Sequence, residues 1–176
     1  MNTNGPIVAF SISAGIHGPC KVDYNINENS THASFERYIS LYIRPGVPVR
    51  RQTSAVKNVV AEFYSTRDQS NNLDAMHVFY KDGTQITEAI EYQSDNDNCA
   101  VFSVADRSRG SPKQKLAQPQ VTRELRIKLN SQNTQEAEQC FQSFKNNLDE
   151  SKKAEISSSL TRPAECLQKL QEFASN

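Results

Sequence analysis

The sequence lacks most of the patterns that identify enzymes and membrane-spanning proteins. No segment approaches the roughly 20 apolar residues that a membrane-spanning helix requires. The six glycines are scattered, and neither a P-loop nor a Gly-x-Gly-x-x-Gly pattern occurs, so no phosphate-binding loop is predicted. The three histidines lie far apart and there is no Cys-x-x-Cys pair, which leaves no metal ligands at a familiar spacing. We therefore predict a protein that is not an enzyme and that holds no metal or other cofactor.

A charge imbalance is also absent, because 20 Lys and Arg residues balance 20 Asp and Glu residues. Net charge thus gives no argument for a nucleic-acid or membrane partner. One local segment is basic: between Arg107 and Lys128, Glu124 is the only acid. The simplest interpretation is a solvated loop, and the alternative is a contact with nucleic acid or an acidic partner. The candidate contacts are Arg107, Arg109, Lys113, Lys115 and Arg123.

Residues 1–20 lack the basic start and the continuous apolar core of a secretory leader. We therefore expect an intracellular protein, nuclear or cytoplasmic, with secretion as the alternative if a leader has been removed. The four cysteines are Cys20, Cys99, Cys140 and Cys166. Buried free thiols are expected, because free cysteine packs as a small apolar residue. An even count also permits two disulfides in any of three connectivities.

Alternation of apolar and polar residues predicts seven strands. They span residues 7–14, 35–43, 56–64, 76–80, 84–92, 100–105 and a last strand that begins at Val121. Lys81-Asp82-Gly83 is a hairpin turn signal between two of them. Residues 23–34 are polar and rich in Asn, which predicts a loop. Residues 106–122 are poor in apolar side chains and predict a mobile insertion in a hairpin.

Two amphipathic helices are predicted after the last strand. Residues 134–148 carry one apolar stripe. Asn133 is expected to be the N-cap, and Glu136 completes a start that resembles a capping box. Phe141 and Phe144 in that stripe are expected to be core residues. A second, short helix over 163–174 presents Leu167, Leu170 and Phe173. It is too short to be stable alone, so it must pack on the domain or on a partner.

These elements predict a domain over 1–150, followed by a tether and a C-terminal helix over 151–176. Seven antiparallel strands capped by one helix resemble the pleckstrin-homology-like (PH-like) superfold, a β-sandwich or barrel. The resemblance rests on NCAVFSV with RELRIKLNSQNTQEAEQCFQSFKNNL, and on FYKDGTQITEAIEY for the preceding hairpin. Two features depart from it. There is no Trp, which many members carry on the helix, and the first hairpin loop has too few basic residues for lipid headgroups.

Within that superfold, the accessory factors of meiotic recombination initiation are similar in RYISLYIRPG, in FYKDGTQITEA and in the helix with its central Cys and Phe. This resemblance implies a nuclear protein-interaction module, a scaffold or adaptor without catalytic residues. Its C-terminal helix would bind a protein partner or a second copy of the chain.

A competing resemblance is to tick salivary lipocalins, through ITEAIEYQSDNDNCAVFSV and EQCFQSFKNN. It implies a secreted carrier that holds a small apolar or amine ligand inside a β-barrel, with all four cysteines paired. Lipocalins have eight strands, whereas the sequence predicts seven. The Gly-x-Trp of their first strand is missing as well.

The terminal helix leads to the first testable prediction. If its stripe binds a partner, Leu167→Asp combined with Leu170→Asp should abolish association, because two charges would replace the apolar contact. The melting temperature of the remaining domain should not change. Size-exclusion chromatography and thermal melts check this, and a double mutant that unfolds as a whole would place the helix in the core instead.

Overall fold

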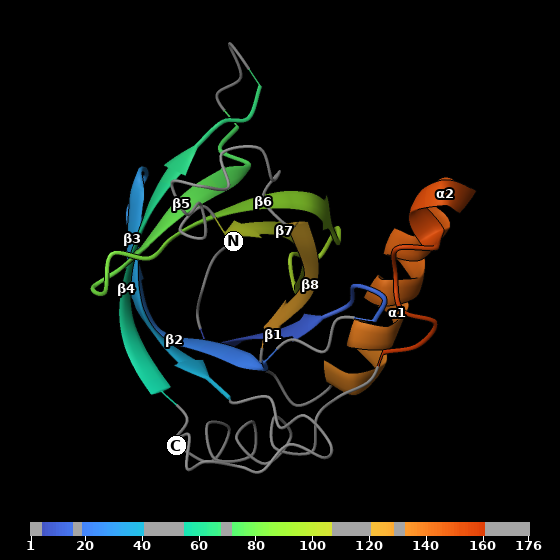
Figure 1. Ribbon diagram of the computed structural model, residues 1–176, viewed down its shortest axis with the longest axis horizontal. Coiled ribbons are helices and arrows are strands. Elements are labelled where there is room, and N and C mark those ends of the chain that lie inside the picture. The colour runs from blue at the N-terminus through green and yellow to red at the C-terminus, as the bar shows by residue number, and fades with distance from the viewer. Residues whose placement is uncertain are drawn as a thin grey trace, which may run out of the picture.

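The computed structural model describes residues 5–15, 19–40, 55–67, 72–106, 121–128 and 133–160. Within these residues the chain forms one closed antiparallel barrel in which every strand pairs with its neighbour in sequence and β8 pairs with β1 (Figure 1). The strands are β1 (Ile7–Ser11), β2 (Lys21–Glu28), β3 (His32–Ile39), β4 (Ala55–Tyr64), β5 (Ala75–Tyr80), β6 (Gln85–Gln93), β7 (Cys99–Asp106) and β8 (Val121–Lys128). Closure leaves no exposed strand edge.

The barrel has eight strands, so the predicted count of seven is wrong. The missing strand is β2, whose residues 23–28 form the first half of the polar segment that we predicted as a loop. Lys21 and Asp23 lie on the face that points into the barrel, where Asp23 pairs with Arg37 of β3, whereas Asn27 pairs with the exposed Ser34. A register shift between Tyr24 and Asn27 further obscures the alternation. Apolar and polar residues do alternate from Lys21 to Asn27, but the high Asn content of residues 23–34 led us to predict a loop.

Other predicted elements are confirmed. The turn between β5 and β6 has Gly83 at a φ of 84°, and the amide of Gly83 donates to the carbonyl of Tyr80 over 3.0 Å. The helix predicted over 134–148 is α1 (Asn133–Asn146). Phe141 and Phe144 are buried, as expected of core residues.

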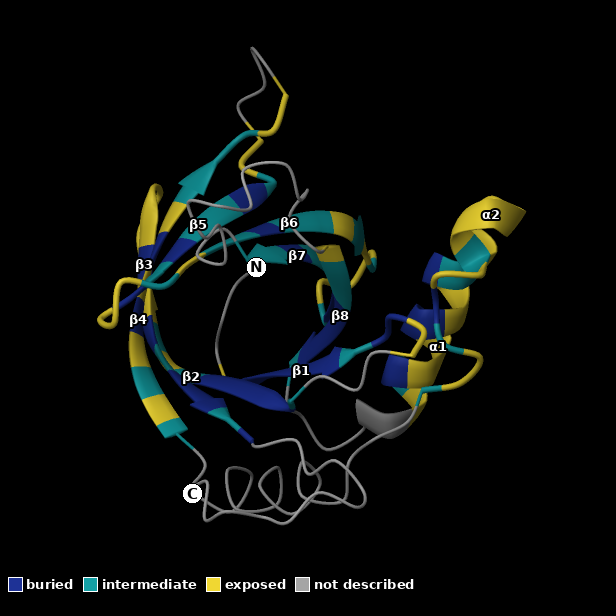
Figure 2. Cartoon of the chain, in the orientation of Figure 1, coloured by how far each residue is buried: buried dark blue, intermediate teal, exposed yellow. Residues whose placement is uncertain are grey.

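Helix α1 packs on the outside of the barrel, beside β7 and β8 (Figure 1). The apolar residues below it point outward from their strands, so the largest apolar cluster lies between barrel and helix, not inside the barrel. The buried faces of β1, β2 and α1 meet there (Figure 2). The cluster contains Val8, Phe10, Ile12, Cys20, Val22, Tyr38, Cys99, Val101, Leu125, Ile127, Ala137, Cys140, Phe141, Phe144 and Ile156.

A second helix, α2 (Glu150–Lys153), follows α1 and was not predicted. Its N-cap is Asp149, whose carboxylate accepts a hydrogen bond from the amide of Lys152. The chain then returns to the barrel: the amide of Ser157 donates to the carbonyl of Ile12 over 2.9 Å, and Ile156 is buried in the cluster. Residues 155–157, in the segment that we predicted as a tether, therefore pair with residues 12–14 just after β1. The predicted helix over 163–174 and most of the predicted insertion, 107–120, lie outside the described residues.

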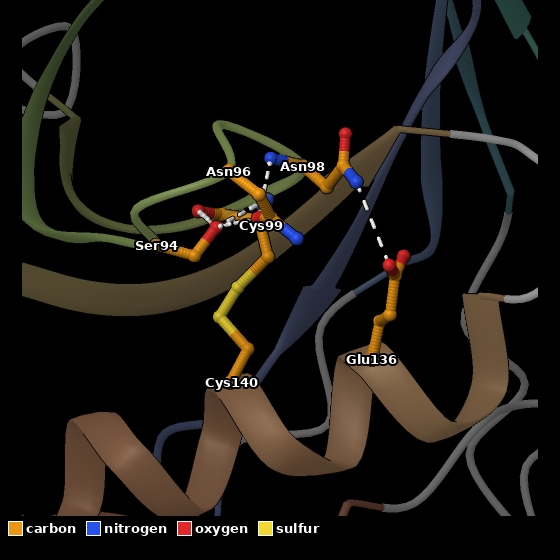
Figure 3. Close-up of a disulfide and its surroundings, with 6 residues drawn as sticks. All are labelled: Ser94, Asn96, Asn98, Cys99, Glu136 and Cys140. Carbon is orange, nitrogen blue, oxygen red and sulfur yellow. Dashed lines mark hydrogen bonds between the residues drawn. A yellow bond between two sulfur atoms is a disulfide. The ribbon is translucent and has the colours of Figure 1, made fainter.

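Two of the four cysteines form a disulfide between the barrel and the helix. Cys99 at the start of β7 is bonded to Cys140 of α1, with 6.4 Å between the Cα atoms (Figure 3). Asn98 reaches Glu136 of the same helix through a hydrogen bond of 3.5 Å. Cys20 is disulfide-bonded as well, and Cys166 lies outside the described residues. The expectation of free thiols is therefore wrong for these three cysteines.

The Cys99–Cys140 bond closes a loop with a sequence separation of 41 residues. In the chain-entropy model such a crosslink stabilises the fold by about 4 kcal/mol. It also fixes α1 over the apolar face of the barrel, whose exposure would otherwise favour association.

The disulfides give a second prediction. Titration of thiols in guanidinium chloride without reductant should find none per chain, and titration after reduction should find four, the number of cysteines. Four thiols before reduction would contradict the crosslinked fold. A mass shift on alkylation, measured with and without reductant, provides the independent check.

Candidate functional site: a charged layer and a cavity inside the barrel

The interior of the barrel contains six charged side chains that no sequence pattern predicted. Strand pairing places them on the inner face, because paired residues point to the same side of a sheet: Asp23 pairs with Arg37, and Ala9 lies between Lys21 and Arg126. All six are buried, with Arg37 and Glu88 fully so. The set, named here the charged layer, consists of Lys21, Asp23, Arg37, Glu88, Glu124 and Arg126.

Arg37 is the centre of one half of the charged layer. Its Nε donates to one carboxylate oxygen of Asp23 over 2.6 Å and its Nη2 donates to the other over 2.8 Å. Its Nη1 donates to Glu88 over 2.8 Å and to the hydroxyl of Tyr80 over 2.9 Å. A bidentate pair of this kind is among the strongest contacts a guanidinium makes.

Arg126 continues the charged layer across the barrel. Its Nη2 lies 2.7 Å from Glu88 and 3.1 Å from Glu124, and Lys21 pairs with Glu124. The order Lys21–Glu124–Arg126–Glu88–Arg37–Asp23 alternates positive and negative groups, three of each, so the charges sum to zero. Each charge therefore has an opposite neighbour, which is the condition under which burial of ions is tolerated.

These contacts set the protonation states of Glu88, Glu124 and Arg37. Burial by itself raises the pKa of Glu88, but Arg126 and Arg37 outweigh burial and hold that pKa below its ordinary value. For Glu124, burial is likewise outweighed by Lys21 and Arg126, and the pKa is lowered. Burial lowers the pKa of Arg37, whereas Asp23 and Glu88 raise it further than burial lowers it. All of these groups are charged at neutral pH.

A cavity of about 330 Å³ lies between the charged layer and one end of the barrel. Its inner end is formed by Asp23 and Arg126. Its walls are mainly apolar, and include Ile7, Ala33, Phe35, Phe63, Met76, Ile90 and Phe102. Its mouth is formed by the turn after β2, with Glu28 and Asn29, and by the segment before β5, with Leu73 and Asp74. Apolar walls with a few fixed polar groups are typical of small-molecule sites.

One of the predicted site residues, Arg123, lies within the described residues, and it does not line the cavity. Arg123 is on β8 but outside the barrel, where it forms ion pairs of 2.7 Å with Glu91 of β6 and with Glu155. It thus joins β8 to the segment after α2. Arg126, from the same basic segment, is only 3% exposed inside the barrel. The remaining candidates lie outside the described residues: Arg107, Arg109, Lys113, Lys115, Leu167, Leu170 and Phe173.

Among the described residues, no group of three His, Cys, Asp or Glu side chains is arranged to hold a metal ion. In the same part of the chain, no helix is long and apolar enough to cross a membrane. No protein-family model matches the sequence, and no curated protein matches it either. The class that the geometry defines is an all-antiparallel β-barrel of eight strands with a C-terminal helix outside it and a cavity within.

Glu88 provides the third prediction. Glu88→Gln should lower the free energy of unfolding by roughly 3–5 kcal/mol at pH 7, because Arg37 and Arg126 would share an uncharged partner in a buried site. The wild-type protein should lose stability as pH falls below about 4.5, since a carboxylate with a lowered folded-state pKa stabilises fully above its unfolded-state pKa and progressively less below it. The variant should show a shallower loss. Urea titrations from pH 3 to 7 measure both quantities.

The matched control is Glu62→Gln on β4, where the side chain is exposed. Its stability at pH 7 should stay within about 0.5 kcal/mol of the wild type. If the two substitutions changed the free energy of unfolding equally, the charged layer would not stabilise the barrel.

Proposed function

We propose that this protein is a lipocalin-like carrier that binds a small, mainly apolar ligand inside the barrel. The observation that carries the proposal is the cavity of about 330 Å³ enclosed by the eight strands. Barrels of this size either fill their interior with side chains or hold one small ligand. Here the charged layer fills one part and the cavity remains in the other.

The strand count favours this resemblance over the PH-like one. A lipocalin barrel has eight strands in an up-and-down order, and the consecutive pairing of β1 to β8 agrees with it. The expected PH-like architecture has seven strands. Disulfide bonding of Cys20, Cys99 and Cys140 adds support for secretion, because such bonds persist mainly in oxidising compartments.

The dimensions of the cavity restrict the ligand. At the lower end of the usual range for ligand pockets, 330 Å³ corresponds to the space of about 11 water molecules. The ligand is therefore a compact molecule of one or two rings, not a long-chain lipid. Its apolar body would lie against Phe35 and Phe102.

The mouth favours a basic group at the outer end of the ligand. Asp74 already accepts two hydrogen bonds of 2.6 Å from Thr66, one from its amide and one from its hydroxyl. Glu28, which is exposed, lines the same cavity. An amine placed there would face two carboxylates while it remained partly in water.

The alternative function, a protein-interaction module of the meiotic accessory type, depends on a C-terminal helix that lies outside the described residues. It remains a prediction, and it gives the cavity no role. Binding of an apolar probe to the cavity separates the two functions.

The fourth prediction uses two neighbouring positions on β3. Ala33 lines the cavity, whereas Ser34 is exposed on the outer face. The apolar fluorophore N-phenyl-1-naphthylamine should bind the wild-type protein saturably. Ala33→Phe should weaken this binding by about tenfold or more, because the ring would occupy the ligand's space. Ser34→Phe adds the same ring outside the barrel and should leave the affinity unchanged.

Fluorescence titration, with circular dichroism to verify folding, makes the comparison. Absence of saturable binding to the wild-type protein, or equal loss in both variants, would contradict a carrier that uses this cavity.

A further inference from the structure

We propose that Asn29 carries an N-linked glycan that lies at the mouth of the cavity and slows the exchange of ligand. The inference rests on the proposed function, because such glycans are attached in the secretory pathway and the cavity gives this one its role. Asn29-Ser30-Thr31 is the only Asn-x-Ser/Thr triplet in the sequence, and neither Ser30 nor the residue after Thr31 is proline. The triplet is therefore a glycan acceptor by its sequence.

The triplet forms the turn between β2 and β3. All three of its residues are exposed, as the attachment of a bulky, hydrophilic glycan requires. The amide of Asn29 donates to the carbonyl of His32 over 2.9 Å, which closes the turn. The amide of Phe63 in β4 donates to the carbonyl of Thr31 over 2.8 Å, which fixes the turn to the neighbouring strand. The position of Asn29 on the barrel is thus well defined.

The side chain of Asn29 uses its oxygen in the turn and leaves its nitrogen available. Oδ1 accepts hydrogen bonds from the amides of Thr31 and His32, over 2.9 and 2.8 Å, and from the hydroxyl of Thr31 over 3.2 Å. Nδ2 makes no hydrogen bond within the part of the chain that the structure describes. A glycan is attached at Nδ2, so it leaves all three contacts of Oδ1 in place.

The attachment is a glycosyl transfer onto Nδ2 of Asn29. The donor is an oligosaccharide joined through its anomeric carbon to a polyprenyl diphosphate. A C–N bond forms between that carbon and Nδ2, while the bond from the carbon to the diphosphate oxygen breaks and the diphosphate leaves with the electron pair. Nδ2 gives up one of its two protons, and nothing is oxidised or reduced. The product keeps Oδ1 as the acceptor that stabilises the turn.

Asn29 lines the mouth of the cavity together with Glu28, Leu73 and Asp74. A glycan there places a bulky hydrophilic group beside the opening. It is attached to an exposed residue, whereas Phe35 and Phe102, against which the ligand would lie, are buried. The glycan therefore obstructs the passage of a ligand more than it changes the contacts of a bound one. Such an obstruction lowers the rate constants of association and dissociation in the same proportion and leaves Kd unchanged.

The first arm of the test determines whether the glycan is present. The full chain, secreted from cultured eukaryotic cells with a secretory leader, should carry one glycan, which peptide-N-glycosidase F removes with conversion of Asn29 to aspartate. Thr31→Ser keeps the triplet and should be glycosylated as well. Thr31→Val keeps the shape of the side chain but loses the hydroxyl, so it should carry no glycan. Intact masses measured before and after the glycosidase treatment make the comparison.

The second arm measures the exchange of N-phenyl-1-naphthylamine by stopped-flow fluorescence, on the glycosylated protein and after glycosidase treatment of the folded protein. Removal of the glycan should raise the association and dissociation rate constants by about threefold or more each, while Kd stays within about twofold. This comparison needs no substitution. Thr31→Val, which keeps the amide of Asn29, controls for the carboxylate that the glycosidase creates and should show the same faster exchange.

The outcomes separate this inference from the function on which it rests. A secreted wild-type chain without a glycan, or a glycan on Thr31→Val, would overturn the assignment of Asn29. Equal rate constants with and without the glycan would overturn its role at the mouth and leave the carrier function standing. No saturable binding of the fluorophore to either form would overturn the carrier function and the role at the mouth together.

Discussion

The fold depends on a row of buried charges that crosses the inside of the barrel. Its contacts join strands far apart in sequence: Arg37 and Glu88 are separated by 51 residues, and Lys21 and Glu124 by 103. Each ion loses its hydration on burial, and only complete pairing compensates for that loss. The row is therefore an all-or-none structure, in which the removal of one member leaves its neighbours charged and unpaired.

Charged side chains occupy part of the barrel interior, and many apolar residues lie on the outer face of the barrel. On β2 and β8, residues that alternate with the charged ones, such as Val22, Leu125 and Ile127, are apolar and point outward, as do Val8 and Phe10 of β1, so they need a cover. Helix α1 provides it, the Cys99–Cys140 disulfide fixes it, and the segment around Ile156 closes its end. The main core thus lies on the flank of the barrel, and the interior is available for another use.

The sizes of the side chains that point into the barrel explain why a cavity remains there. Near the charged layer, long side chains fill the interior, whereas toward the mouth small residues such as Ala33 alternate with rings such as Phe35 and leave a cavity. Asp23 and Arg126 of the charged layer also form the inner end of the cavity. A substitution of either residue should therefore affect both the stability of the barrel and the binding of a ligand.

Local patterns in the sequence determined much of the secondary structure. The stripe of α1, the buried Phe141 and Phe144, the Asp82-Gly83 turn and most of the strands follow from periodicity and turn chemistry. These features depend on residues close together in the chain, so the sequence alone suffices for them. The cavity and the charged layer could not be predicted, because Asp23, Arg37 and Glu88 come from three separate segments.

Tertiary structure alone decided which face of each strand is the interior. Alternation shows that Leu125 and Ile127 share one face and Arg126 the other, but solvent and a buried ion pair are equally compatible with an arginine in that pattern. Strand β2 was missed because its Asp and Asn residues are typical of loops, although Asp23 pairs with Arg37 inside the barrel. The pairing of Cys99 with Cys140 likewise depended on where the helix packs. Periodicity shows which residues share a face of a strand. Only the closed barrel shows whether that face points to the interior or to the outside.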